Sequence, residues 1–162
     1  MKALRLVAKI LCVLFGISIV GCCTPWKVAT MTGYDNLSGD DKHPGSVAEY
    51  TGTTPRFLNA VPVVSILLRD WKRFRYHNIN IMYNFKIYRV QAWDLCSDDD
   101  CQNCCTRNAK HFGGDFLLDV ERRTLEKVFK VKHYEDTMDL VHYQICDAFD
   151  PEPIAKEFGL RK

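Results

Sequence analysis

Hydrophobic and polar positions alternate most clearly between residues 77 and 93. Ile79, Ile81 and Tyr83 occupy every second position there, with polar residues or Met82 between them. This two-residue period is typical of a strand with one buried face. Shorter alternating patterns at residues 116–121, 127–134 and 140–146 predict further strands, and residues 122–126 are expected to form a hairpin turn. The pattern therefore predicts a sheet of about four antiparallel strands.

A helical spacing of apolar residues precedes these strands, between residues 57 and 76. Val61, Val64, Leu68 and Trp71 recur at intervals of three or four, and Pro62 falls in the first turn, where a helix tolerates it. The β-branched residues of the same stretch also suit a strand, and this alternative stays open. Residues 153–158 predict a short terminal helix that stops at Gly159. We therefore expect an α+β fold in residues 57–162, with one N-terminal helix packed on the antiparallel sheet.

The first residues of the chain have the pattern of an export signal. Lys2, Arg5 and Lys9 precede an almost unbroken apolar run at residues 10–20. That run is shorter than the roughly 20 residues that a membrane-spanning helix needs. Ile19-Val20-Gly21-Cys22 follows at its end and resembles the lipobox of bacterial lipoproteins.

The resemblance implies that residues 1–21 are a signal peptide and that cleavage occurs before Cys22. It further implies that Cys22 carries diacylglycerol and an acyl chain such as palmitate on its amino group. Two or more acyl chains hold a protein firmly on a membrane. Because Cys23 and not aspartate follows Cys22, the resemblance implies an outer-membrane protein that faces the periplasm. The alternative is an ordinary secretory signal on a secreted, disulfide-rich protein without lipid.

Turn-forming residues dominate the stretch after the lipobox. Glycine, proline, aspartate, serine and threonine are frequent up to residue 56, which is typical of irregular chain. Residues 22–56 are therefore expected to be the lipidated cysteine and a tether, followed by the folded domain at residues 57–162.

The cysteines indicate an oxidising compartment. If Cys22 carries lipid, an even set of six remains in the mature chain, which favours disulfides. We expect a disulfide-rich loop after the long strand, a Cys96–Cys146 bridge, and different partners for Cys104 and Cys105, because bridging neighbours strains the backbone. The candidates for disulfides are Cys23, Cys96, Cys101, Cys104, Cys105 and Cys146.

A metal or redox site is the alternative for the same cysteines. Cys101 and Cys104 have the spacing that lets two thiolates bind one zinc ion, and Cys105 or His111 is the candidate for a third ligand. Exported proteins rarely keep thiols reduced. We therefore predict no metal and no cofactor. The second interpretation is an exported protein that uses the thiols of this cysteine-rich loop for redox chemistry or metal binding.

Charge and missing motifs narrow the class of function. Three of the 22 basic residues lie in the predicted signal, so 19 remain against 20 acidic ones. The mature chain has no basic excess that would favour nucleic acid. It has no glycine-rich phosphate loop, G-x-S-x-G or HExxH motif. We therefore expect a non-enzymatic cell-envelope lipoprotein with a structural or protein-binding role, whose partners are membrane lipid through Cys22 and another envelope protein.

Overall fold

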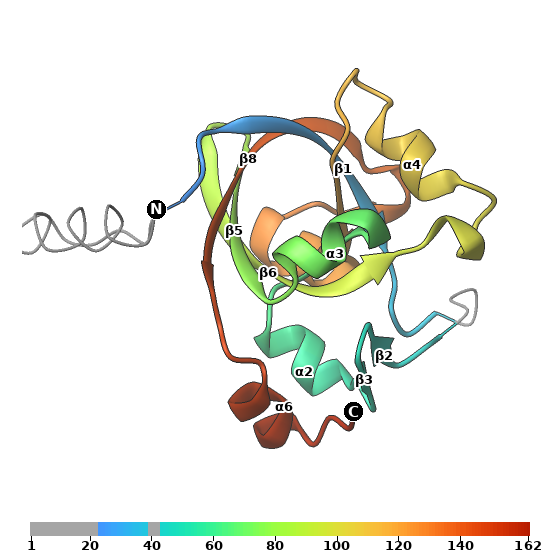
Figure 1. Cartoon of the computed structure of the whole chain (residues 1–162), viewed down its shortest axis with the longest axis vertical. Coiled ribbons are helices and arrows are strands. Elements are labelled where there is room, and N and C mark those ends of the chain that lie inside the picture. The colour runs from blue at the N-terminus through green and yellow to red at the C-terminus, as the bar shows by residue number, and fades with distance from the viewer. Residues whose placement is uncertain (1–22, 39–42) are drawn as a thin grey trace, which may run out of the picture.

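A computed structural model describes residues 23–38 and 43–162 of the chain (Figure 1). Six strands close into a barrel in the order β1-β7-β4-β6-β5-β8. The β1/β7 and β4/β6 pairs are parallel, and the other four pairs are antiparallel. The strands are β1 (Lys27–Tyr34), β4 (Val63–Leu67), β5 (His77–Tyr83), β6 (Lys86–Cys96), β7 (Leu117–Glu121) and β8 (Met138–Ala148).

Short elements connect the barrel strands and cover the barrel. A separate two-stranded sheet consists of β2 (Ser46–Val47) and β3 (Tyr50–Thr51). The α-helices are α2 (Pro55–Ala60), α3 (Leu68–Phe74), α4 (Cys104–Ala109), α5 (Arg122–Thr124) and α6 (Glu152–Phe158). A π-helical turn η2 (Leu125–Phe129) and two 3-10 turns, η1 (Asp98–Asp100) and η3 (Tyr134–Asp136), complete the described part. No helix in this part is long and apolar enough to cross a membrane.

The hydrophobic core fills the barrel and extends beneath α2 and α6. Ile79, Ile81 and Trp93 are fully buried. The ring of Phe57 on α2 packs edge-on against Trp93, with 5.3 Å between ring centroids, and against Phe158 on α6 at 5.6 Å. Figure 1 shows α2 and α6 together beside one end of the barrel, near the C-terminus. Closure of the barrel leaves none of its six strands as an unpaired edge.

The predicted fold class, one N-terminal helix on a four-stranded antiparallel sheet, is wrong. Residues 63–67 form the strand β4, and only short helices flank it. All five residues of β4 are buried. A strand whose residues are all buried carries apolar residues on both faces, so β4, which is apolar except for Ser65, shows no clear alternation. The helical spacing at residues 57–76 was therefore misleading, and the strand alternative was correct for this part.

The structure also divides the long strand predicted at residues 77–93. β5 and β6 form a hairpin whose turn consists of Asn84 and Phe85, both with positive φ, 48° and 60°. Paired positive φ values at the two central residues are the geometry of a type I′ turn. In the sequence, the two-residue alternation continues across the turn through Phe85 and Ile87. Both side chains are exposed, however, and do not belong to the buried face.

The expected tether at residues 22–56 is likewise corrected by the structure. Residues 27–34 are β1, which lies in the barrel wall between β7 and β8. Ala29 and Met31 are fully buried in the core. The segment after it, with β2, β3 and α2, also packs on the barrel. Glycine and threonine in this stretch therefore belong to a packed strand and its loops.

The hairpin predicted over residues 116–134 is wrong in its second half. β7 confirms the strand at residues 116–121, but the next residues form helical turns, and Lys130 ends them with a φ of 62°. These turns bury Leu125 and Phe129 in the core. The strand predicted at residues 140–146 lies within β8, and the terminal helix ends at Gly159, as predicted.

Three disulfides join Cys23 with Cys146, Cys96 with Cys105, and Cys101 with Cys104. Disulfide bonding is confirmed, as are different partners for Cys104 and Cys105. The predicted Cys96–Cys146 bridge is wrong. β5 lies between β6 and β8, so the two strands are about 10 Å apart, and a disulfide joins Cα atoms at most about 7 Å apart. Cys22, the predicted lipidation site, lies outside the described residues.

Candidate functional site

A row of polar side chains crosses four neighbouring strands of the barrel. Thr32 on β1 pairs with Asp119 on β7, Asp119 pairs with Ser65 on β4, and Ser65 pairs with Asp94 on β6. Directly paired residues point to the same face of a sheet. The positions beside Thr32 and Asp119 in sequence are buried in the core, so the row faces outward.

Asp119, Ser65 and Asp94 of this row form the floor of a cleft with a volume of about 620 Å³. Thr32 lies beside this floor, paired with Asp119. One wall is the cysteine-rich segment between β6 and α4, and the other consists of residues 34–38 and 43–51. The residues that line the cleft are Tyr34, Asp35, Ser38, His43, Ser46, Ala48, Thr51, Ser65, Asp94, Leu95, Cys96, Ser97, Asp100, Cys101, Cys104, Cys105, Asp119 and Tyr134.

Asp94 organises one side of the floor through three hydrogen bonds. Its Oδ1 accepts from the backbone N–H groups of Ala48, at 2.8 Å, and Leu95, at 2.9 Å. Its Oδ2 accepts from the hydroxyl of Tyr34 at 2.9 Å. On the other side, Oδ1 of Asp119 accepts from the hydroxyl of Thr32 at 2.7 Å. These contacts fix the carboxylates before any ligand arrives.

The hydroxyl of Tyr34 stays protonated at ordinary pH. Burial raises the pKa of Tyr34 well above its usual value, and the negative charges of Asp94 and Asp119 raise it further. The whole residue is only partly buried, so the buried part is the hydroxyl end, beside Asp94. A protonated phenol is a hydrogen-bond donor, which matches its role toward the Asp94 carboxylate.

Arginines balance part of the negative charge at the cleft wall. Asp35 pairs with Arg122 at 2.8 Å and with Arg123 at 3.3 Å. Arg123 also pairs at 2.7 Å with Glu121, whose side chain is fully buried. Burial raises the pKa of Glu121, and the hydrogen bonds and charge of Arg123 oppose this rise. The network holds the end of β1 against the helical turns after β7.

Gly33 allows a second tyrosine to reach the cleft. A Cβ atom at Gly33 would lie 2.6 Å from the backbone oxygen of Tyr134 and equally close to the side chain of Leu125. Only glycine lets η3 approach β1 this closely. The close approach places Tyr134 in the cleft lining.

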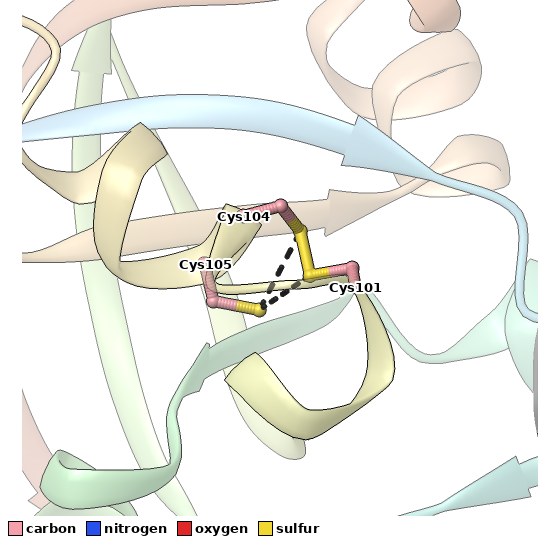
Figure 2. A group of neighbouring side chains, drawn as sticks. All are labelled: Cys101, Cys104 and Cys105. Atoms are coloured by element: carbon pink, nitrogen blue, oxygen red, sulfur yellow. Dashed lines mark hydrogen bonds between the residues drawn. A yellow bond between two sulfur atoms is a disulfide. The ribbon is translucent and has the colours of Figure 1, made fainter.

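Four of the six predicted disulfide cysteines lie at this cleft. The Sγ atom of Cys105 is 3.7 Å from that of Cys101 and 3.9 Å from that of Cys104, as Figure 2 shows. Three sulfurs at this spacing could hold a metal ion only as thiolates. All three are disulfide-bonded here, so the cluster acts as a covalent brace for the wall. Cys23 and Cys146 lie elsewhere, just before β1 and on β8.

Asp98 supports the same wall by ordering the start of α4. Its carboxylate accepts hydrogen bonds from the backbone N–H and the hydroxyl of Thr106, at 2.8 and 2.5 Å. These bonds lower the pKa of Asp98. The aspartate run at residues 98–100 thus includes one residue that stabilises the helix.

The sequence analysis missed the polar row of the floor. A weak signal existed, because Ser65 interrupts Val63-Val64-Ser65-Ile66-Leu67 and Asp119 interrupts Leu117-Leu118-Asp119-Val120. A polar residue within a buried strand needs a partner or a function. The pairing that aligns these residues joins strands far apart in sequence and is visible only in the fold.

Comparison with known proteins identifies no family for this chain. No family model matches it, and no curated protein matches it. Among solved structures, the apo expansin of Clavibacter michiganensis is similar with a TM-score of 0.46 and 11% identity over 77% of this chain. A D78N mutant of that expansin in complex with cellohexaose gives a TM-score of 0.44 and 10% identity over 75% of this chain. The chain spans about half the length of both expansin chains, 52% and 50%.

A third solved structure of similar size also shares only a distant likeness. The Streptomyces papain inhibitor has a TM-score of 0.45 and 15% identity, covering 75% of this chain and 94% of its own. All three TM-scores are below 0.5. The function is therefore argued from the cleft itself.

Proposed function

We propose that this chain is a non-enzymatic binding protein of the bacterial cell envelope and that its cleft holds a neutral, polyhydroxylated ligand such as a glycan chain. The observation that carries this proposal is the outward row of hydroxyl and carboxylate groups on the cleft floor, Asp119, Ser65 and Asp94.

The row has the hydrogen-bonding groups that a sugar requires. Carboxylates accept hydrogen bonds from ligand hydroxyls, and serine, threonine and tyrosine hydroxyls both donate and accept. Neighbouring strands are about 4.8 Å apart, so the row presents such groups at regular intervals. The volume of about 620 Å³ is within the usual range for small-ligand sites.

The contacts of the carboxylates favour binding over catalysis. Asp94 already accepts three hydrogen bonds, two of them from backbone N–H groups. A carboxylate whose oxygens are already engaged in this way is held in place as a hydrogen-bond acceptor. The charge of Asp35 is balanced by Arg122 and Arg123, so this carboxylate at the cleft wall is already paired within the protein.

Export and lipid anchoring are the second part of the proposal. The lipobox at Ile19-Val20-Gly21-Cys22 supports attachment of lipid at Cys22. Three disulfides support an oxidising compartment such as the periplasm. Intact mass of the membrane-extracted protein tests this part: cleavage before Cys22 with added acyl chains is expected. Loss of the acyl mass in Cys22→Ala is the control.

Glycan binding is tested by titrating the protein with cellohexaose and chitohexaose and following backbone amide NMR shifts. We expect shifts concentrated on β1, β4, β6 and β7. Asp119→Asn should weaken binding about tenfold, which corresponds to about 1.4 kcal/mol. Asp147→Asn is the matched control, because Asp147 is a half-exposed carboxylate on β8 that pairs with Arg89 at 2.7 Å. Absence of shifts at the cleft with both sugars would reject the glycan and favour a protein as the ligand.

A further inference from the structure

The chain is fixed to the barrel immediately after the predicted anchor. Cys23 is disulfide-bonded to Cys146 on β8. The N–H of Thr24 donates to the carbonyl of Ile145 at 2.8 Å, and the N–H of Ile145 donates to the hydroxyl of Thr24 at 3.0 Å. Successive Cα atoms are about 3.8 Å apart. A lipid on Cys22 would therefore be only one residue from the barrel wall, with no tether between them.

The wall beside this attachment point is unusually apolar. Eight large apolar side chains stay exposed in the described part of the chain, and six of them lie just before β1, on β1, on β8 or at the β5–β6 hairpin. Isolated exposed apolar residues are ordinary, but a gathered set indicates an interaction surface. We call this set the anchor-side wall: Trp26, Val28, Phe85, Ile87, Met138 and Leu140.

Strand pairing places several of these residues next to one another. Ile87 pairs with Met82, Met82 pairs with His142, and His142 pairs with Val28. The row therefore crosses β6, β5, β8 and β1. His142 and Cys146 are an even number of residues apart on β8, so they face the same way. The Cys23–Cys146 bridge thus lies on the same outer face as this apolar row.

We propose that the anchor-side wall lies directly on the surface of the phospholipid bilayer that holds the anchor. The inference rests on the lipid at Cys22 proposed above. Trp26 and Phe85 are aromatic residues suited to the interface between headgroups and acyl chains. Lys27 and Lys86 are exposed next to them and can contact lipid phosphates. The one-residue connection favours a bilayer over a soluble partner, because it holds the wall at the membrane surface.

The conformation of Phe85 is a second, independent observation for this surface. Phe85 has a φ of 60° and a fully exposed side chain. An aromatic residue in this left-handed region is strained, and glycine would relieve the strain. Strain at an exposed apolar tip is expected where the side chain has a function outside the fold. Contact with lipid is such a function.

This orientation would point the cleft away from the membrane. β7 and β4 of the cleft floor lie across the barrel from β5 and β8 in the strand order. In Figure 1 the described chain begins beside β5 and β8, whereas α4, β2 and β3 lie on the other side. A ligand in the periplasm would then reach the cleft freely.

The test uses the full acylated protein in vesicles of phosphatidylethanolamine and phosphatidylglycerol, with brominated acyl chains that quench nearby tryptophan. Phe85→Trp, in a Trp26→Phe background that is also used for the control, carries the reporter on the anchor-side wall. Leu68→Trp is the control, because Leu68 has 51% exposure and lies outside that wall, after β4. We expect at least twofold more quenching for the reporter at position 85. In the natural chain, Trp26→Phe should remove most of the quenched emission.

The first failure concerns protein whose mass shows the acyl chains. If quenching there is equal at positions 85 and 68, or absent at 85, the docking is overturned and the anchor stays intact. A mass without acyl chains would instead overturn the anchor, and the docking with it. The two failures are therefore distinguishable in one preparation.

Discussion

At the scale of single residues, Tyr34 connects the barrel wall to the cleft. Its hydroxyl donates to Asp94, which in turn holds the backbone of Ala48. A hydrogen bond to a charged group contributes about 1.5–3 kcal/mol. We expect Tyr34→Phe to lower the free energy of unfolding by about 2 kcal/mol, measured by urea denaturation. Tyr88→Phe, on β6 against Phe129, is the control. An equal loss in both variants would show that the Asp94 contact is not the cause.

A second residue, Tyr143, should make stability depend on alkaline pH. Burial raises the pKa of Tyr143 to about 12, with a further contribution from Asp70. In the unfolded chain a tyrosine ionises near pH 10. Above that pH the unfolded state binds fewer protons than the folded state, so the free energy of unfolding falls as pH rises from about 10 to about 12.

The matched measurement compares Tyr143→Phe with the natural protein in urea at several pH values. Two pKa units correspond to about 2.7 kcal/mol. Tyr34 and Tyr76 also have raised pKa values. Their ionisation therefore lowers the free energy of unfolding at alkaline pH in both proteins alike. The variant should therefore show a shallower decline, by about 2 kcal/mol between pH 10 and 12. Parallel curves would contradict the assignment to Tyr143.

At the scale of elements, the β5–β6 hairpin should be more stable with glycine at its turn. Phe85 has a φ of 60°, which costs an ordinary residue about 1–2 kcal/mol relative to glycine. We expect Phe85→Gly to raise the free energy of unfolding by about 1 kcal/mol and yet to weaken contact with vesicles. Asn84→Gly is the control, since asparagine tolerates this region and the gain should be smaller. A destabilised Phe85→Gly variant would mean that the Phe85 side chain stabilises the fold itself.

Elements with local signals were predictable, and those that depend on distant pairing were not. Strand β7, the central part of β8 and the terminal helix before Gly159 were found from alternation and a glycine stop. β1 was missed because its glycine and threonines, set among turn residues, look like loop. β4 was taken for a helix because burial of all its residues removes the two-residue period. The parallel β1/β7 pair joins residues 87 positions apart at Thr32 and Asp119, so no local pattern could align the cleft floor.

At the scale of the whole molecule, the barrel separates two surfaces of opposite character. The cleft floor crosses β7, β4 and β6, whereas the anchor-side wall lies on parts of β1, β8, β5 and β6, and the two surfaces meet where Met138 pairs with Thr32. Both sides are braced by disulfides, two at the cleft and one beside the anchor. This arrangement is what the proposed anchor requires, because the cleft would then stay open to a ligand while the wall lies on the membrane.

The three disulfides should differ greatly in their contribution to stability. A bridge limits the unfolded chain more when it closes a longer loop. Cys23 and Cys146 are 123 positions apart, whereas Cys101 and Cys104 are 3 apart. The loop-entropy relation gives about 5 kcal/mol for the first bridge and about 2 kcal/mol for the second. Urea denaturation of the two double alanine variants should show this order, and a larger loss for the short bridge would contradict it.

Removing the long bridge should also lengthen the connection between anchor and barrel. In Cys23→Ala/Cys146→Ala, the hydrogen bonds of Thr24 with Ile145 hold the residues before β1 near β8, and β1 itself pairs with β8 from Lys27 onward. Once the Thr24 bonds open, residues 23–26 lengthen the connection and let the wall move away from the bilayer. We expect the quenching of the tryptophan at position 85 to fall at least twofold in this background, while Cys101→Ala/Cys104→Ala leaves it unchanged. Undiminished quenching would show that the apolar side chains hold the wall on the membrane without help from the covalent link.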